Sequence, residues 1–190
     1  MRAALDKMVS WIGLVVAAVL IVAGVLLTWG HNFITGQVHD QLAAQKIYFP
    51  PADSPAVAGS EFAAMRQYGG QLMTTGSQAE VYADHFIAVH LSEIAGEKTY
   101  AELSSLAQAN PNDQQLAAQV QTMFRGETLR GLLLNAYAFG TVGTIAGAAA
   151  IVAFAGGALM LILAALGFWH ARRRLPAPSA AADQEPEPIS

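Results

Sequence analysis

The feature that most constrains this chain is Gly131–Trp169, a run of 39 consecutive residues without any Asp, Glu, Lys, Arg or His. A bilayer core of roughly 30 Å needs about 20 helical residues at about 1.5 Å each. As a single helix, this run would extend about 60 Å. It therefore predicts a transmembrane helix with a surplus at one end that protein, rather than lipid, must cover.

A second apolar run, of 19 residues, extends from Trp11 to Trp29. Tryptophans at both ends match the two headgroup layers of a bilayer. A cleaved signal peptide is the alternative interpretation. The run is long for the apolar part of such a peptide, however, and no convincing small-x-small cleavage site follows it. The sequence thus favours an uncleaved first span at residues 11–29.

Basic residues beside the two runs predict that both termini face the cytoplasm. Arg2 and Lys7 precede the first run, and Arg172, Arg173 and Arg174 follow the second. Between the runs there are ten acidic residues and five basic ones, which predicts that this segment lies on the outer face of the membrane.

The second span is expected at residues 148–169, because about 20 residues counted back from Trp169 fill the bilayer. The sequence then divides into a cytoplasmic N-terminus (1–10), the first span (11–29), an extracytoplasmic domain (30–147), the second span (148–169) and a cytoplasmic tail (170–190). The tail is rich in Pro, Ala and acidic residues, a composition typical of disorder.

The segment between the spans is expected to be helical, because it contains no strand-like alternation of useful length and no hairpin turn signal. The first helix should continue outward for three or four turns and stop at Tyr48–Pro51, where two prolines interrupt it. Further helices are expected at residues 61–73, with a break at Gly69–Gly70, and at 80–95, 100–109 and from 111 onward. The predicted fold class is all-α, with two transmembrane helices extended outward into a small, bundle-like helical domain.

Four local signals set the expected helix starts. Ser60 is predicted to cap the helix at 61–73, and Asn110 with Pro111 to begin the last helix. Two capping boxes are predicted, Ser77 with Glu80 and Thr99 with Glu102. The helix at 80–95 is expected to present an apolar stripe to the core, made of Val81, Tyr82, Phe86, Val89 and Ile94.

Small residues at three- and four-residue spacing mark one face of the long apolar run. They allow another helix to approach closely, so they predict a helix-packing interface. Two partners are compatible with it, the first span of the same chain and another subunit on the opposite face. The predicted interface residues are Gly140, Gly143, Gly147, Ala150 and Gly157. The predicted membrane-interface anchors are Trp11, Trp29, Trp169, Arg172, Arg173 and Arg174.

No motif in this sequence carries recognisable chemistry. The five-residue spacing of His85 and His90 puts them about 140° apart on a helix, which is wrong for two metal ligands. Nucleophile, P-loop and dinucleotide motifs are missing, and there is no cysteine. A net charge of −4 offers no basic surface for nucleic acid. We therefore expect no catalysis, no metal, no cofactor and no nucleic-acid partner.

The order of elements resembles two-span bacterial membrane proteins built like a receptor ectodomain on a helical hairpin, and the alanine-rich composition is similar to that of small membrane proteins of high-GC bacteria. The resemblance covers the whole chain but identifies no functional residue.

Two hypotheses follow from the sequence. The first is a non-enzymatic accessory or structural subunit of a larger cytoplasmic-membrane complex (respiratory, transport or envelope assembly), with lipid and a membrane protein or a second copy as partners. The second is an outer domain that binds or senses a ligand or lipid in a pocket lined by the apolar helix.

Overall fold

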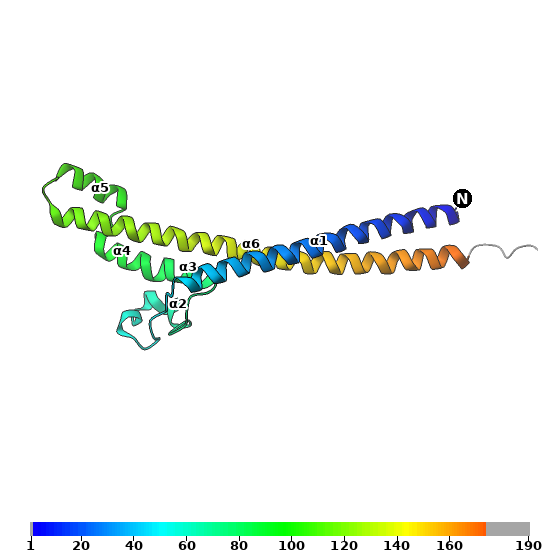
Figure 1. Cartoon of the computed structure of the whole chain (residues 1–190), viewed down its shortest axis with the longest axis horizontal. Coiled ribbons are helices and arrows are strands. Elements are labelled where there is room, and N and C mark those ends of the chain that lie inside the picture. Colours follow the sequence, from blue (N-terminus) through cyan, green and yellow to red (C-terminus); the bar gives the residue numbers. More distant parts are fainter. Residues whose placement is uncertain (1, 174–190) are drawn as a thin grey trace, which may run out of the picture. The chain divides into compact units, whose positions relative to one another are not determined.

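The computed structural model describes residues 2–173, so Arg174 and the rest of the predicted tail lie outside the described residues. The fold is all-α, as predicted, and within residues 2–173 the only β-pairing is an isolated bridge between Tyr48 and Leu72. In chain order the helical elements are α1 (Arg2–Ala44), η1 (Pro55–Val57), η2 (Ser60–Phe62), α2 (Ala63–Arg66), α3 (Gly76–Tyr82), η3 (Ala83–Ile87), α4 (Ala88–Ala95), α5 (Tyr100–Ala109) and α6 (Gln114–Arg173) (Figure 1).

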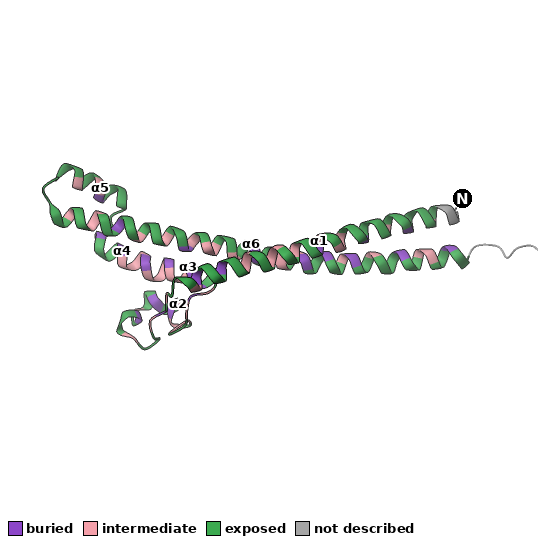
Figure 2. Ribbon diagram, in the orientation of Figure 1, coloured by how far each residue is buried: buried purple, intermediate pink, exposed green. Residues whose placement is uncertain are grey.

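Two of these helices, α1 and α6, are long and apolar enough to cross a membrane, which confirms the prediction of two such helices. By its internal contacts the chain forms two units, Met1–Leu26 with Ala149–Ser190, and Leu27–Ala148. Both long helices contribute to both units. Figure 2 shows that most residues on the helices of the first unit are exposed, whereas buried residues are concentrated on α3 and α4 in the second.

In the first unit, α1 and α6 pack antiparallel through small residues. Gly13 lies beside Ala164, and Gly157 lies beside Ile21, so residues later in α1 meet residues earlier in α6. Small side chains at such contacts let two helices approach closely. The described part of this unit is therefore a helical hairpin.

The second unit has a core to which α1, the 45–75 loop, α3, α4 and α6 all contribute. The loop is held by backbone hydrogen bonds: Phe49 N–H donates to Gln71 O (2.9 Å), and Met73 N–H donates to Ile47 O (2.9 Å). The largest fully buried side chains are those of Leu42, Phe49, Val57, Met65, Met73 and Leu133.

The helix predicted at 61–73, with a break at Gly69–Gly70, is observed only in its first part, because helical structure there stops at Arg66. Ser60 does not cap it; Gly59 precedes the first turn without a side-chain cap. The Arg66 guanidinium instead donates to the carbonyls of Val57 (2.8 Å) and Gly59 (2.9 Å) and so closes the preceding loop. Residues 69–73 leave the helix because their backbone pairs with residues 47–49.

The helix predicted at 80–95 is observed, but it begins earlier and contains a π-helical turn, η3. It ends as predicted at Gly96, which adopts φ +58°. One row of buried residues recurs at every fourth position along this helix. Those buried residues are Ala79, Ala83, Ile87, Leu91 and Ala95.

The predicted apolar stripe flanks this buried row. Val81, Tyr82, Phe86 and Val89 are partly buried against the core, but Ile94 is exposed, so its assignment to the core is wrong.

One of the two predicted capping boxes is confirmed. Glu102 N–H donates to Thr99 Oγ1 (3.3 Å), and Thr99 N–H donates to the Glu102 carboxylate (2.8 Å). These hydrogen bonds from the Thr99 backbone and hydroxyl hold the pKa of Glu102 below its ordinary value.

The predicted Ser77–Glu80 box is wrong, because Thr75 and Gln78 form the box instead. Gln78 N–H donates to Thr75 Oγ1 (3.2 Å), and Thr75 N–H donates to Gln78 Oε1 (3.1 Å). The helix consequently starts at Gly76, the residue that touches α6.

The predicted start of the last helix is also wrong. Asn110 ends α5, and its Nδ2 donates to Leu106 O (2.9 Å). Helix α6 begins at Gln114, where Asp113 Oδ1 accepts from Leu116 N–H (2.9 Å).

Candidate interaction sites

The predicted packing glycines face helices of the same chain. In the second unit, His31 Nδ1 lies 2.7 Å from Gly143 O, the distance of a ring N–H that donates to a carbonyl. A Cβ placed on Gly143 would lie 3.2 Å from Ile34 Cγ2, and one on Gly147 would lie 2.9 Å from the His31 ring. Both glycines therefore allow α6 to approach α1.

Gly140 contacts a different element from its two neighbours. A Cβ on Gly140 would lie 3.3 Å from the Cα of Gly76, at the start of α3. A Cβ on Gly76 would lie 3.0 Å from both Ala136 O and Tyr137 Cα, which are backbone atoms of α6. Sequence reasoning missed Gly76, since a glycine among threonines and serine is typical of a turn.

The other two predicted packing residues lie in the first unit. Ala150 is buried. A Cβ on Gly157 would lie 3.1 Å from Ile21 Cγ1. Both positions therefore belong to the helical hairpin.

The predicted anchors are exposed at the positions that the structure describes. Trp11 contacts Phe168 edge-on in the first unit, with ring centroids 5.8 Å apart. The Arg173 guanidinium lies 3.8 Å from the centroid of the Trp169 ring, a cation–π contact. Arg172 is exposed beside it. These side chains combine an apolar body with a polar end, as residues at a headgroup layer do.

Trp29, the remaining anchor, lies in the second unit and stacks on Phe33, with ring centroids 5.6 Å apart and planes at 16°. Both rings are exposed. We call these two stacked rings, near the start of the α1 segment in the second unit, the aromatic step.

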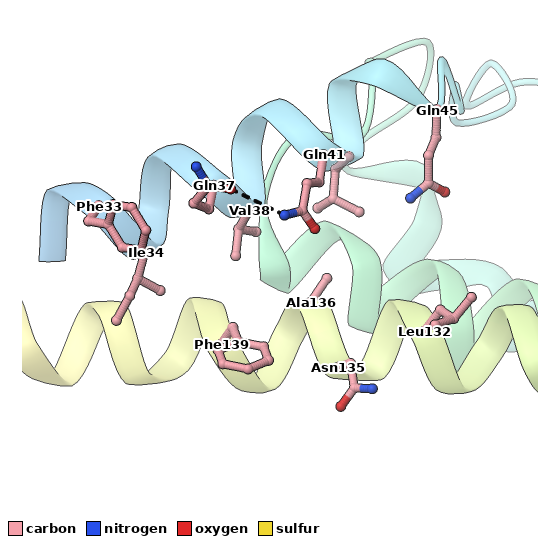
Figure 3. A pocket seen from close by; sticks show the side chains of 11 residues that line it. Phe33, Ile34, Gln37, Val38, Gln41, Gln45, Leu132, Asn135, Ala136 and Phe139 are labelled. Atoms are coloured by element: carbon pink, nitrogen blue, oxygen red, sulfur yellow. Dashed lines mark hydrogen bonds between the residues drawn. The ribbon is translucent and has the colours of Figure 1, made fainter. Parts of the chain in front are cut away.

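Beyond this step, an open groove of about 460 Å³ runs between α1 and α6 within the second unit (Figure 3). Its floor is apolar, made by Ile34, Val38, Leu42 and Ala136. Phe33, Leu132 and Phe139 also line it and remain exposed. Sequence reasoning expected α6 to line a pocket but could not identify α1 as the opposite wall.

The polar groups of this groove are amides, and no charged side chain lines it. Gln37 and Gln41 of α1 and Gln45, directly after its end, follow one another at four-residue spacing. Gln41 Nε2 donates to Gln37 Oε1 (3.3 Å). Asn135 points away from α1 in Figure 3, so the glutamines supply the polar edge on that side.

An ion pair connects the π-helical turn to α6. Arg130 Nη2 lies 2.9 Å from Asp84 Oδ1, and Arg130 Nη1 lies 3.5 Å from Glu127 Oε2. The hydrogen bond to Asp84 raises the pKa of Arg130 above its ordinary value. The pair fixes the helices relative to each other within the second unit. It is part-exposed, and such pairs contribute modestly to stability.

The titratable groups considered as metal ligands are dispersed. His85 Nδ1 lies 3.2 Å from Glu61 O, and His90 Nδ1 lies 2.7 Å from Phe86 O, so each histidine contacts a separate backbone carbonyl. Among the residues that the structure describes, no three His, Asp or Glu side chains gather as a metal site. Partial burial raises the pKa of Tyr82, which lies among the aromatic rings of the core.

No protein-family model, curated protein or solved structure matches this chain. The groove and the exposed apolar side chains are therefore the features on which a function can be based.

Proposed function

We propose that this chain is a two-span protein of the bacterial cytoplasmic membrane that acts as a non-enzymatic accessory or structural subunit of a larger membrane complex. In this proposal residues 11–29 and 148–169 cross the bilayer, both termini are cytoplasmic, and residues 30–147 form the outer domain. Support for the membrane location comes from large apolar side chains that are exposed on the hairpin, among them Val19, Leu26, Ile151 and Val152. In lipid such exposure is favourable, whereas in water it is costly.

The observation that carries the subunit function is an exposed aromatic pair, Tyr100 and Phe124, whose ring centroids are 6.0 Å apart. Their exposed fractions are 39% and 53%. Phe124 lies about 36 Å along α6 from Ala148, at about 1.5 Å per residue, so lipid cannot cover it. Exposed aromatic side chains of this kind are enriched where proteins bind one another. A protein partner therefore accounts for this pair.

The membrane orientation can be tested with single cysteines, because the natural chain contains none. In intact cells, a membrane-impermeant maleimide should label Ala109→Cys, which lies at the exposed end of α5. The same reagent should label Ser179→Cys only after lysis. The reverse pattern, or release of the protein by an alkaline carbonate wash, would contradict the proposed topology.

Partner binding can be tested by placing a charge in the aromatic pair. Phe124→Glu should reduce the amount of high-mass complex on native gels in mild detergent by at least tenfold, because a buried unpaired carboxylate opposes association. Thr122→Glu is the matched control, since Thr122 is exposed on another face of the same turn. Recovery of the wild-type protein as a lone monomer would count against a subunit role.

A second candidate function is the binding of a lipid or another apolar ligand by the outer domain. The groove between α1 and α6 favours it, because its lining is apolar with a few amides and without charge. The two functions are compatible, since the groove and the aromatic pair use different residues.

A further inference from the structure

We infer that the groove between α1 and α6 holds one hydrocarbon chain of a bilayer phospholipid. This inference rests on the proposed membrane location. Residues 30–147 contain ten acidic and five basic residues, yet none of them lines the groove. An occupant without charge along most of its length matches such a lining, whereas a peptide segment would bring polar backbone groups to an apolar floor.

The dimensions of the groove match an acyl chain. From Phe33 to Gln45 the α1 wall is about 18 Å long at about 1.5 Å per residue. One leaflet of a bilayer core of about 30 Å is about 15 Å deep, which is the length that one acyl chain fills.

A second copy of the chain or a partner helix fits the groove less well. A helix about 10 Å in diameter would occupy about 1,400 Å³ over the same length. The groove holds about 460 Å³. Its volume therefore suits a thin, flexible chain rather than a helix.

The position of the groove gives a bilayer lipid access to it. It begins at Phe33, the ring that stacks on Trp29, and Trp29 is the proposed anchor at the outer headgroup layer. An acyl chain that leaves the bilayer at this aromatic step would cover Phe33, then Phe139 and then Leu132, the lining residues with the largest exposed apolar side chains. The glutamine amides along α1 supply uncharged donors and acceptors at its edge (Figure 3).

Photolabelling of the full chain in phosphatidylcholine nanodiscs tests this inference. A trace of phosphatidylcholine with a diazirine at the end of one acyl chain is activated by light, and adducts are mapped by peptide mass spectrometry. Adducts are expected on residues 33–42 of α1 in addition to residues 11–29 and 148–169. Those residues of α1 are unaltered in the variants below, so they provide a constant readout.

The variant Leu132→Lys/Phe139→Lys places two cations in the groove wall and should reduce adducts on residues 33–42 at least fivefold. The control Leu129→Lys/Val142→Lys alters two exposed apolar residues of α6 outside the groove. It should leave the number of adducts on residues 33–42 unchanged. If the spans are labelled and the groove is not, the inference is overturned while the membrane location stands. Equal labelling of residues 33–42 in both variants would have the same meaning. Spans and groove both unlabelled would overturn the inference together with the membrane location.

Discussion

Replacing Phe49 with alanine is expected to lower the free energy of unfolding of the second unit by about 3–5 kcal/mol, the usual cost of removing a fully buried aromatic ring. Phe49 is only 2% exposed. Its ring centroid lies 5.2 Å from that of Tyr68 and 5.5 Å from that of Tyr82. The substitution would leave a cavity where the 45–75 loop meets α3, at a residue whose backbone also pairs with Gln71.

Thermal unfolding of the purified protein in mild detergent, followed by circular dichroism and intrinsic fluorescence, would measure this loss. Tyr48→Ala is the matched control, because Tyr48 precedes Phe49 directly and is 58% exposed. The control should change stability by less than about 1 kcal/mol. Equal effects of the two substitutions would show that the loop does not pack as described. Membrane extraction should be unchanged in both variants, since the hairpin does not contain this loop.

The helices of this protein could be predicted from sequence where the signal lies within one helix. The apolar runs, the continuation of the first helix beyond Trp29, the box at Thr99 and the stop at Gly96 all depend on residues a few positions apart. The end of the first helix was predicted too late, because α1 stops at Ala44, before Lys46 adopts φ +53° and well before the prolines. Such signals act before any tertiary contact forms, and nothing in the rest of the structure opposes them.

The wrong helix starts were decided by tertiary contacts. Ser77 and Thr75 are both capable caps, and capping energies of about 1 kcal/mol do not separate them. The contact between Gly76 and Gly140 decides between the two caps, because a helix that starts at Gly76 brings a residue without a side chain against α6. Similarly, the glycines at 69 and 70 predicted a break, but the pairing of residues 70–73 with residues 47–49 is a tertiary contact that no local pattern reveals.

In the candidate sites, too, features within one helix could be predicted and contacts between helices could not. The small-residue face of α6 could be read from spacing alone, but the helices it meets could not. Gly143 lies against α1 and Gly140 against α3, although the two residues are only three apart. The groove depends on how α1 and α6 lie together within the second unit, so its α1 wall, including the three glutamines, was not predictable from either helix alone.

The double substitution Gly143→Leu/Gly147→Leu is expected to destabilise the second unit by at least about 1–3 kcal/mol, the cost of overpacking at one site. The two costs should not simply add, because both glycines lie one turn apart against the same helix. A side chain on Gly143 meets Ile34, and one on Gly147 meets the His31 ring. Separating the helices would also break the hydrogen bond between His31 and Gly143 O, a further loss of about 1 kcal/mol.

The matched control is Gly131→Leu in the same helix, where a Cβ would meet no atom within 4 Å. It should leave stability unchanged or raise it by up to about 1 kcal/mol, since leucine favours a helix more than glycine does. Thermal stability and the amount of native complex, measured on the same samples, show whether the small-residue face of α6 packs on α1 of the same chain or on another subunit. Because Gly143 and Gly147 already contact α1, the double variant should lose thermal stability even as an isolated monomer. Loss of the complex at unchanged monomer stability would instead assign these glycines to another subunit, and no change in either would show that neither contact matters.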